Sequence, residues 1–164
     1  MLILVERVIV MKKGKIMFCS SAGGHYTELM QLKSLIVKYN GVVVTEKTKL
    51  SLETTLPTEY VIYSSKNDGW IYFFEYFYVW CVSFYYFIKY FPKVIISTGV
   101  HSTIPMCIFG RLFGRKVIYI ETIANIKTPS MTGKIMYRIA TDFYVQWEEM
   151  KQFYPNAICK GGIY

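Results

Sequence analysis

Short apolar runs alternate with amphipathic stretches along most of this chain. Seven runs have the length and the β-branched or aromatic content of buried strands: 15–19, 42–45, 60–63, 94–98, 117–120, 143–145 and 157–159. Helical spacing appears between them, in a stretch that ends at Asn40-Gly41 and at 46–56, 70–91, 103–112, 132–140 and 147–153. Strands that alternate with helices predict an α/β fold, a parallel sheet with helices on both faces. Ligands of such sheets bind beyond the carboxyl ends of the strands.

The first strand leads into a helix through the loop Ser20-Ser21-Ala22-Gly23-Gly24-His25. Paired glycines let the backbone approach a ligand, and the start of a helix favours an anion such as phosphate. The dinucleotide fingerprint requires a third glycine where Thr27 stands, and the Walker sequence Gly-Lys-Ser/Thr is absent. The sequence therefore predicts an anion site of neither common type, with a plain strand-to-helix turn as the alternative.

Three loops, 20–25, 97–102 and 121–125, are predicted at the ligand-binding edge, and they contain both histidines of the chain. His25 and His101 are expected to face one crevice, with His25 as a candidate base near neutral pH. Ser102 is a candidate contact at the start of a helix that has Pro105 in its first turn. Glu121 ends a strand and is a candidate for holding a hydroxyl group. The alternatives are structural: a core histidine, a helix cap and a carboxylate without a role.

Composition narrows the class of protein. With 164 residues the chain is expected to form one domain. Hydrophobic residues make up 53%, with 15 Tyr, 11 Phe and 3 Trp, so a membrane or a partner is expected to cover part of the surface. The net charge of +8 suits an acidic surface, an anionic lipid or a phosphorylated substrate. Nucleic-acid motifs are absent, the four cysteines are far apart, and the spacing of His and Glu predicts no metal and no cofactor.

Residues 70–91 form an aromatic run of about six helical turns that Pro92 ends. Its length would suffice to cross a bilayer, but Glu75, Ser83, Lys89 and several tyrosines gather on one side. This arrangement predicts a helix that lies in the membrane interface, and the alternative is a helix between the sheet and a protein partner. The residues predicted to face lipid are Trp70, Phe73, Phe74, Phe77, Trp80, Phe84 and Phe87.

The first residues of the chain are apolar but carry charges within the run. They are too short to span a bilayer and have no cleavage pattern, so they are not read as a secretion signal. Met11 is as natural a start as Met1. The first ten residues are therefore expected to be dispensable, and we divide the chain into a short amino-terminal extension, 1–13, and one domain, 14–164.

Taken together, four motifs resemble the family of the eukaryotic asparagine-linked-glycosylation protein fourteen and its bacterial relatives in capsule and exopolysaccharide synthesis. The motifs are Ser20–His25 with Glu28-Leu29, Ser97-Thr98-Gly99 with Pro105, Ile120-Glu121-Thr122 with Lys127–Ser130, and Tyr144–Glu148. The resemblance implies a Rossmann-like domain, the amino-terminal half of a GT-B glycosyltransferase. The half that binds the UDP-sugar is then a separate chain, expected to continue from the last strand. The eukaryotic members also carry an amino-terminal membrane anchor, which the short charged start does not resemble.

By this resemblance the chain is expected to be the acceptor-binding and membrane-docking subunit of a two-chain glycosyltransferase. The acceptor would be a polyprenyl-diphosphate sugar at the cytoplasmic face of the membrane, and the chain alone would be inactive. The resemblance implies these roles: Ser21, Gly23 and Gly24 near the acceptor diphosphate, His25 on the acceptor hydroxyl, Gly99, His101 and Ser102 in the crevice, and Glu121 orienting acceptor or loop. Two alternatives stay open: an adaptor that recruits a complete glycosyltransferase, and a nucleotide-dependent enzyme with Glu46 on a ribose.

Overall fold

The computed structural model describes residues 1, 5–6, 14–63 and 69–163. Its seven strands form one sheet in the order β3-β2-β1-β4-β5-β6-β7, and every neighbouring pair is parallel. All seven predicted strands are confirmed: β1 (Ile16–Cys19), β2 (Val42–Glu46), β3 (Thr58–Val61), β4 (Val94–Ser97), β5 (Lys116–Ile120), β6 (Asp142–Val145) and β7 (Ile158–Cys159).

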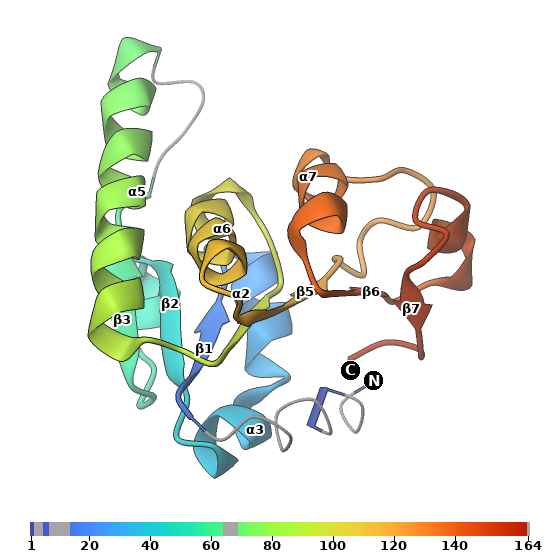
Figure 1. Cartoon of the computed structure of the whole chain (residues 1–164), viewed down its shortest axis with the longest axis horizontal. Helices are drawn as coiled ribbons and strands as arrows, with labels where there is room; N and C mark the ends of the chain where they lie inside the picture. The colour runs from blue at the N-terminus through green and yellow to red at the C-terminus, as the bar shows by residue number, and fades with distance from the viewer. Residues whose placement is uncertain (2–4, 7–13, 64–68, 164) are drawn as a thin grey trace.

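Helices cover both faces of the sheet, as predicted (Figure 1). Successive strand residues point to opposite faces, so Met17 packs with α5 (Trp70–Tyr90), α6 (Ile104–Leu112) and α7 (Met131–Ile139). Phe18 packs on the other side, with α2 (Gly24–Met30) and α3 (Lys33–Lys38). Because both faces are covered, the central strands are apolar throughout, which is why their sequences read as continuous apolar runs.

Three predicted helices differ from the structure, two of them in their bounds. The helix after the glycine loop is two helices, α2 and α3, and it ends as predicted at Asn40-Gly41. Asn40 is left-handed with φ 47°, and the Gly41 N–H donates to the Ile36 carbonyl at 2.8 Å. The helix predicted at 46–56 is only α4 (Lys49–Leu52), because Thr48 and Ser51 form a capping box that starts it late.

The structure also contains two short 3₁₀ turns: η2 (His101–Thr103), at the end of the second predicted loop, and η3 (Glu148–Gln152), after β6. The first leads into α6, whose first turn contains Pro105 as predicted. The second occupies the stretch predicted as a helix at 147–153.

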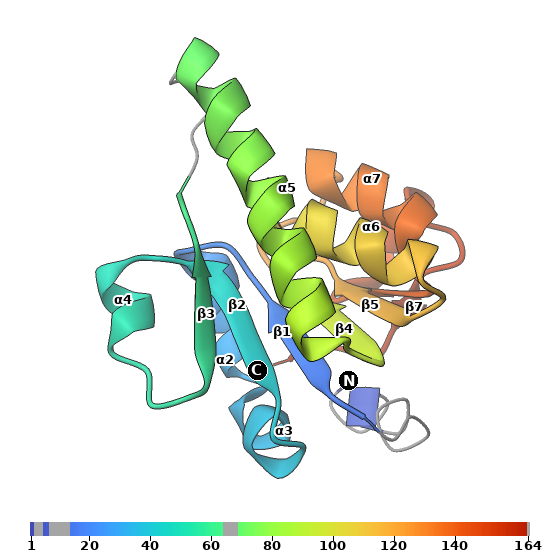
Figure 2. The same ribbon diagram turned by 60° about the vertical axis from the view of Figure 1, so that its left-hand side comes forward.

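Helix α5 lies against the protein with the side that carries its polar residues. Val79, Ser83 and Phe87 are buried, and the amino-terminal half of the helix projects beyond the sheet and α6 (Figures 1 and 2). The prediction that Phe87 faces lipid is therefore wrong. It shares the inner stripe of the helix with Val79 and Ser83, and its ring packs 5.1 Å from that of Phe113.

The described part of the amino-terminal extension packs on the domain. Val5 is fully buried among residues of the α2 and α3 side, and the Met1 amino group donates to the Lys160 carbonyl at 3.3 Å. The two ends of the chain are thus neighbours, as Figure 1 shows. Glu6 also pairs with Lys38 of α3, and this pairing lowers the pKa of Glu6. These contacts of Met1, Val5 and Glu6 oppose the expectation that the first ten residues are dispensable.

Candidate functional site

The carboxyl ends of β1, β4 and β5, which are adjacent in the sheet, bring together the three predicted loops. His25 lies in the first turn of α2, directly above the loop that follows β4. Its Nδ1 is 2.8 Å from the carbonyl oxygen of Thr98, and the Thr98 hydroxyl donates to the His25 carbonyl at 2.9 Å. These two hydrogen bonds between His25 and Thr98 hold the first predicted loop against the second.

The imidazole of His25 has a defined orientation. A carbonyl oxygen only accepts hydrogen bonds, so Nδ1 carries the proton and the neutral ring keeps its lone pair on Nε2. The side chain remains 29% exposed, which leaves it reachable from solvent. This is the state that a histidine needs to accept a proton from a bound hydroxyl group.

The imidazole ring of His25 packs directly on the backbone of Gly99. A Cβ atom at Gly99 would stand 2.9 Å from His25 Nδ1, and the residue has a φ of +119°, a conformation that side chains rarely adopt. Gly99 is buried beneath the imidazole. It therefore acts on the site through His25, whereas the sequence predicted that it lines the crevice.

Glu28, one turn along α2 from His25, was not among the predicted site residues. Its carboxylate is 3% exposed and accepts from the Thr122 hydroxyl at 2.9 Å and from the Ile123 N–H at 2.7 Å. The other oxygen, Oε2, lies 3.7 Å from His25 Nδ1 and has no hydrogen bond within the described part of the chain. The i, i+3 spacing of His25 and Glu28 was the sequence signal for this pair.

The glycine loop is open but is backed by negative charge. Cβ atoms at Gly23 and Gly24 would meet nothing within 4 Å, and Gly23 has a φ of 72°. Behind them, the buried carboxylate of Glu46 accepts from the Ala22 N–H at 3.0 Å. A carboxylate there disfavours an anion, which counts against phosphate at this loop. It also takes Glu46 out of reach of a ribose, so the nucleotide-enzyme interpretation loses its binding residue.

Ser21 and Ser102, both predicted as ligand contacts, are turned inward. Ser21 is 6% exposed and its hydroxyl donates to the Ala22 carbonyl at 3.3 Å. Ser102 is 4% exposed, and its buried hydroxyl has no hydrogen-bond partner among the residues described. Both lie at the predicted edge, but their side chains belong to the packing beneath it.

Glu121 is 1% exposed, so its carboxylate lies beneath the surface of the site, where it contacts the neighbouring loop. Its pKa is raised by burial, although several hydrogen bonds favour the charged form. The donors to its carboxylate are Ser130 Oγ at 3.0 Å, Tyr154 OH at 3.2 Å, Thr122 N at 3.2 Å and Asn125 Nδ2 at 3.4 Å. Gly133 is required beside it, since a Cβ there would fall 1.8 Å from Oε2. Glu121 holds the 121–133 segment in place.

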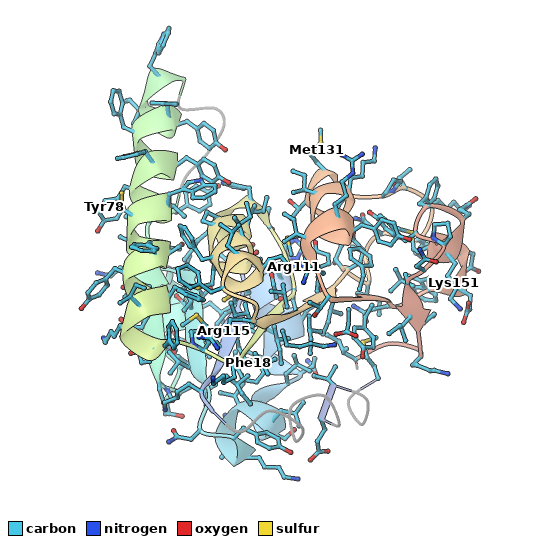
Figure 3. All side chains as sticks on the ribbon, in the orientation of Figure 1. Phe18, Tyr78, Arg111, Arg115, Met131 and Lys151 are labelled. Atoms are coloured by element: carbon cyan, nitrogen blue, oxygen red, sulfur yellow. The ribbon has the colours of Figure 1, made fainter. Side chains whose placement is uncertain are left out.

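A cavity of about 490 Å³ opens between the amino-terminal half of α5, the start of α6 and the start of α7. It has the size of a small-molecule site. Its lining combines hydroxyl and apolar groups: Tyr63, Tyr72, Tyr76, Val100, His101, Ile104, Ser130, Met131, Thr132 and Ile135. Figure 3 shows Met131 at the tip of α7, where it borders this opening.

His101 lines the cavity and His25 does not, so the two histidines do not share it. The His101 ring lies 6.0 Å from the ring of Tyr72 and 5.8 Å from that of Tyr76, and the Tyr76 hydroxyl donates to its carbonyl at 3.3 Å. The two histidines are nevertheless linked through the loop that follows β4. The ring of His25 rests on Gly99, and the next two residues form the cavity wall.

Sequence reasoning missed Tyr72, Tyr76 and Ser130 as site residues. Ser130 is the N-cap of α7, accepting from the Gly133 N–H at 2.8 Å, and a serine before a helix is a recognisable signal. The two tyrosines are four residues apart on the polar side of α5. The sequence identified that side of the helix, and the structure shows that it forms a wall of the cavity.

The outer side of α5 is strongly apolar. Trp70, Phe73, Phe74 and Phe77 are between 63% and 89% exposed, and Phe84 is 43% exposed. We call these five residues the aromatic face. Trp80, predicted with them, is half-buried, with its ring 5.6 Å from that of Phe109. Among the described residues, one helix is long enough and apolar enough to cross a membrane, and that helix is α5.

No group of three His, Cys, Asp or Glu side chains that could hold a metal occurs in the part of the chain that the structure describes.

Fold and topology define a Rossmann-like α/β domain of the kind found in GT-B glycosyltransferases. MurG of Acinetobacter baumannii superposes with a TM-score of 0.67 at 16% identity, over 83% of this chain and 42% of MurG. A UDP-GlcNAc 2-epimerase of Neisseria meningitidis gives a TM-score of 0.69 at 11% identity, over 90% of this chain and 46% of the epimerase. This chain thus matches less than half of either structure, and at such identities the likeness shows the fold alone.

The chain belongs to the family described as "Oligosaccharide biosynthesis protein Alg14 like", whose profile matches residues 70–163. The UDP-N-acetylglucosamine transferase subunit ALG14 of Homo sapiens is 35% identical over 78 residues, which are 44% of this chain and 36% of the human protein. The corresponding subunit of Mus musculus is 27% identical over 91% of this chain and 82% of its own length. The human match thus spans about a third of that relative.

Proposed function

We propose that this chain is the acceptor-binding and membrane-docking subunit of a two-chain glycosyltransferase. The complex would transfer a sugar from a UDP-sugar to a polyprenyl-diphosphate-linked sugar in cell-surface polysaccharide synthesis, as in a capsule or exopolysaccharide. The observation that carries this proposal is the position of the cavity. It lies beside the projecting aromatic end of α5, so a binding site for a polar group adjoins a surface suited to lipid.

The aromatic face supports docking at the membrane interface. Five large aromatic side chains in contact with water are costly in a soluble monomer, and Trp and Phe are favoured at the depth of lipid headgroups. The net charge of +8 adds attraction to anionic lipids. We assign the chain to the cytoplasmic face as a peripheral or monotopic protein, where UDP-sugars are available.

The cavity supports binding of the polar head of the acceptor. His101, Tyr72 and Thr132 contribute hydrogen-bonding groups to it, and Val100 and Ile104 contribute apolar walls. Sugars and phosphates are bound by such a mixture of polar and apolar groups. We place the diphosphate here, because the carboxylate of Glu46 lies behind the glycine loop.

His25 is the proposed base for the acceptor hydroxyl. Its Nε2 keeps a lone pair, and the open space over Gly23 and Gly24 leaves room for a sugar ring to approach. Glu28 is a positioning residue, because its buried carboxylate lies beside Nδ1 and stabilises the charge that the ring acquires with the proton. Glu121 positions the neighbouring loop.

The UDP-sugar site is assigned to a second chain. The relatives are described as transferase subunits, and this chain corresponds to less than half of MurG. Sugar transfer reconstituted from two purified chains, this one and a candidate donor-binding subunit, tests the proposal. Activity that needs both chains supports it, and activity of the partner alone would make this chain an adaptor.

A further inference from the structure

A second concave surface lies on α5, on the side toward α6. It is a groove of about 290 Å³ lined by Phe73, Tyr76, Phe77 and Trp80, which stand at i, i+3, i+4 and i+7 and so form one stripe of the helix. The four lining side chains are all aromatic.

The groove has one fixed wall and one open wall. Tyr76 is tied to the His101 carbonyl, and Trp80 packs edge-on against Phe109, so these two side chains are held by the protein. Phe73 and Phe77 are 67% and 63% exposed and form the outer wall. Such a groove admits an apolar chain from the side without any rearrangement of the fold.

Tyr76 lines both the groove and the cavity of about 490 Å³ described above. One compartment carries hydroxyl and imidazole groups and the other only aromatic walls, and they meet at a single side chain. A ligand that fits both must have a polar head joined directly to a hydrocarbon chain.

We propose that the groove binds the first isoprene units of a polyprenyl diphosphate whose head occupies the cavity. This inference rests on the proposed function, because that function supplies the class of acceptor. A volume of about 290 Å³ is at the lower limit of ligand sites and suits only a short part of the chain. The remainder of the polyprenyl chain continues into the bilayer along the aromatic face.

The groove shares Phe73 and Phe77 with the aromatic face, but it does not extend around the helix to Tyr78. Figure 3 shows Tyr78 on the outer side of the helix, pointing away from α6. Tyr78 is 51% exposed and does not line the groove, although it is the neighbour of Phe77 in the sequence. These two positions therefore make a matched pair of variants.

The test is the affinity of the full chain for farnesyl diphosphate, measured by calorimetry without vesicles and below the micelle concentration. Inorganic diphosphate is the head-only probe. We expect Phe77→Ser to weaken farnesyl diphosphate binding about tenfold, or about 1.4 kcal/mol. Tyr78→Ser should leave this binding unchanged, and inorganic diphosphate should bind both variants and the wild type equally.

Three results would contradict the proposal that the groove binds isoprene units. They are no binding of farnesyl diphosphate, equal affinity for inorganic and farnesyl diphosphate, and equal losses of farnesyl diphosphate affinity in the two variants. Thermal unfolding of both variants verifies that they fold. Because no sugar is transferred in this assay, its failure is distinguishable from failure of the two-chain enzyme, which the transfer assay reports separately.

Discussion

The imidazole of His25 donates from Nδ1 to the backbone carbonyl of Thr98, 2.8 Å away, and so presents Nε2 to the open side of the site. The acceptor is a main-chain atom of a neighbouring strand end, which makes the orientation of the ring a property of the fold. A catalytic base needs a fixed ring orientation, because its lone pair must point at the substrate.

Replacement of His25 by Ala should lower kcat of the partnered enzyme by about a hundredfold, since a positioned base contributes at least that much. Vesicle binding should stay unchanged, because His25 is not part of the aromatic face. Initial rates with both chains present, together with flotation of the variant, measure the two properties. Unchanged turnover would leave His25 as a structural residue.

Glu28→Gln keeps an oxygen for the Thr122 hydroxyl and the Ile123 N–H but removes the charge beside His25. We expect kcat to fall roughly ten- to a hundredfold with little change in KM, because the imidazolium loses its counter-charge. Glu46→Gln is the matched control, a neutralised buried carboxylate at the same edge that contacts Ala22. Equal losses of kcat in the two variants would argue against a specific role for Glu28.

Glu121 predicts a pH dependence of stability. Because burial raises its pKa above the ordinary value of 4.5, its contribution is fully present below that value and is lost as pH rises through the raised pKa. Glu121→Gln should therefore gain stability relative to the wild type over this window, by about 1.4 kcal/mol for each unit of the rise. Denaturant unfolding at a series of pH values measures this, and a pH-independent difference would contradict it.

The amino-terminal segment should contribute to stability. Val5→Ala is expected to lower the free energy of unfolding by roughly 1 to 3 kcal/mol, because Val5 is fully buried. Val37→Ala is the control, since the same change falls on a side chain that is 63% exposed. Urea unfolding of both variants decides the point. Equal stabilities would mean that the burial of Val5 adds nothing measurable to the stability of the domain.

The aromatic face should govern membrane binding. Phe73→Ser combined with Phe74→Ser should reduce partitioning to anionic vesicles at least about tenfold, because each ring withdraws apolar area from water. Leu112→Ser, at a residue 73% exposed elsewhere on the surface, should change nothing. Flotation with purified vesicles measures the bound fraction. Equal flotation of all three proteins would exclude this face as the docking surface.

The strands were predictable because each is a short run rich in apolar residues, and the central ones are buried on both faces. The three loops followed from the rule for parallel sheets. The burial of Glu121 was not predictable. It depends on Ser130, Tyr154 and the missing side chain of Gly133, which only the folded chain brings together. The role of Glu28 was not predictable for the same reason, because its hydrogen-bond partner Thr122 is 94 residues away in the sequence.

Helix α5 shows what helical periodicity leaves open. Its polar and apolar sides were recognised, but the polar side faces the protein, where Tyr86 donates to the Tyr60 carbonyl and Tyr90 to the Glu59 carboxylate. Helical periodicity identifies a side, and only the position of the helix on the sheet decides what that side contacts.

The most direct measurement is sugar transfer from a UDP-sugar to a polyprenyl-diphosphate-glucose acceptor in vesicles. It compares this chain, a candidate donor-binding subunit, and the two together. The account predicts transfer only when both chains are present, and its loss when His25→Ala replaces the wild type. Full transfer by the second subunit alone, or by this chain alone, would contradict it.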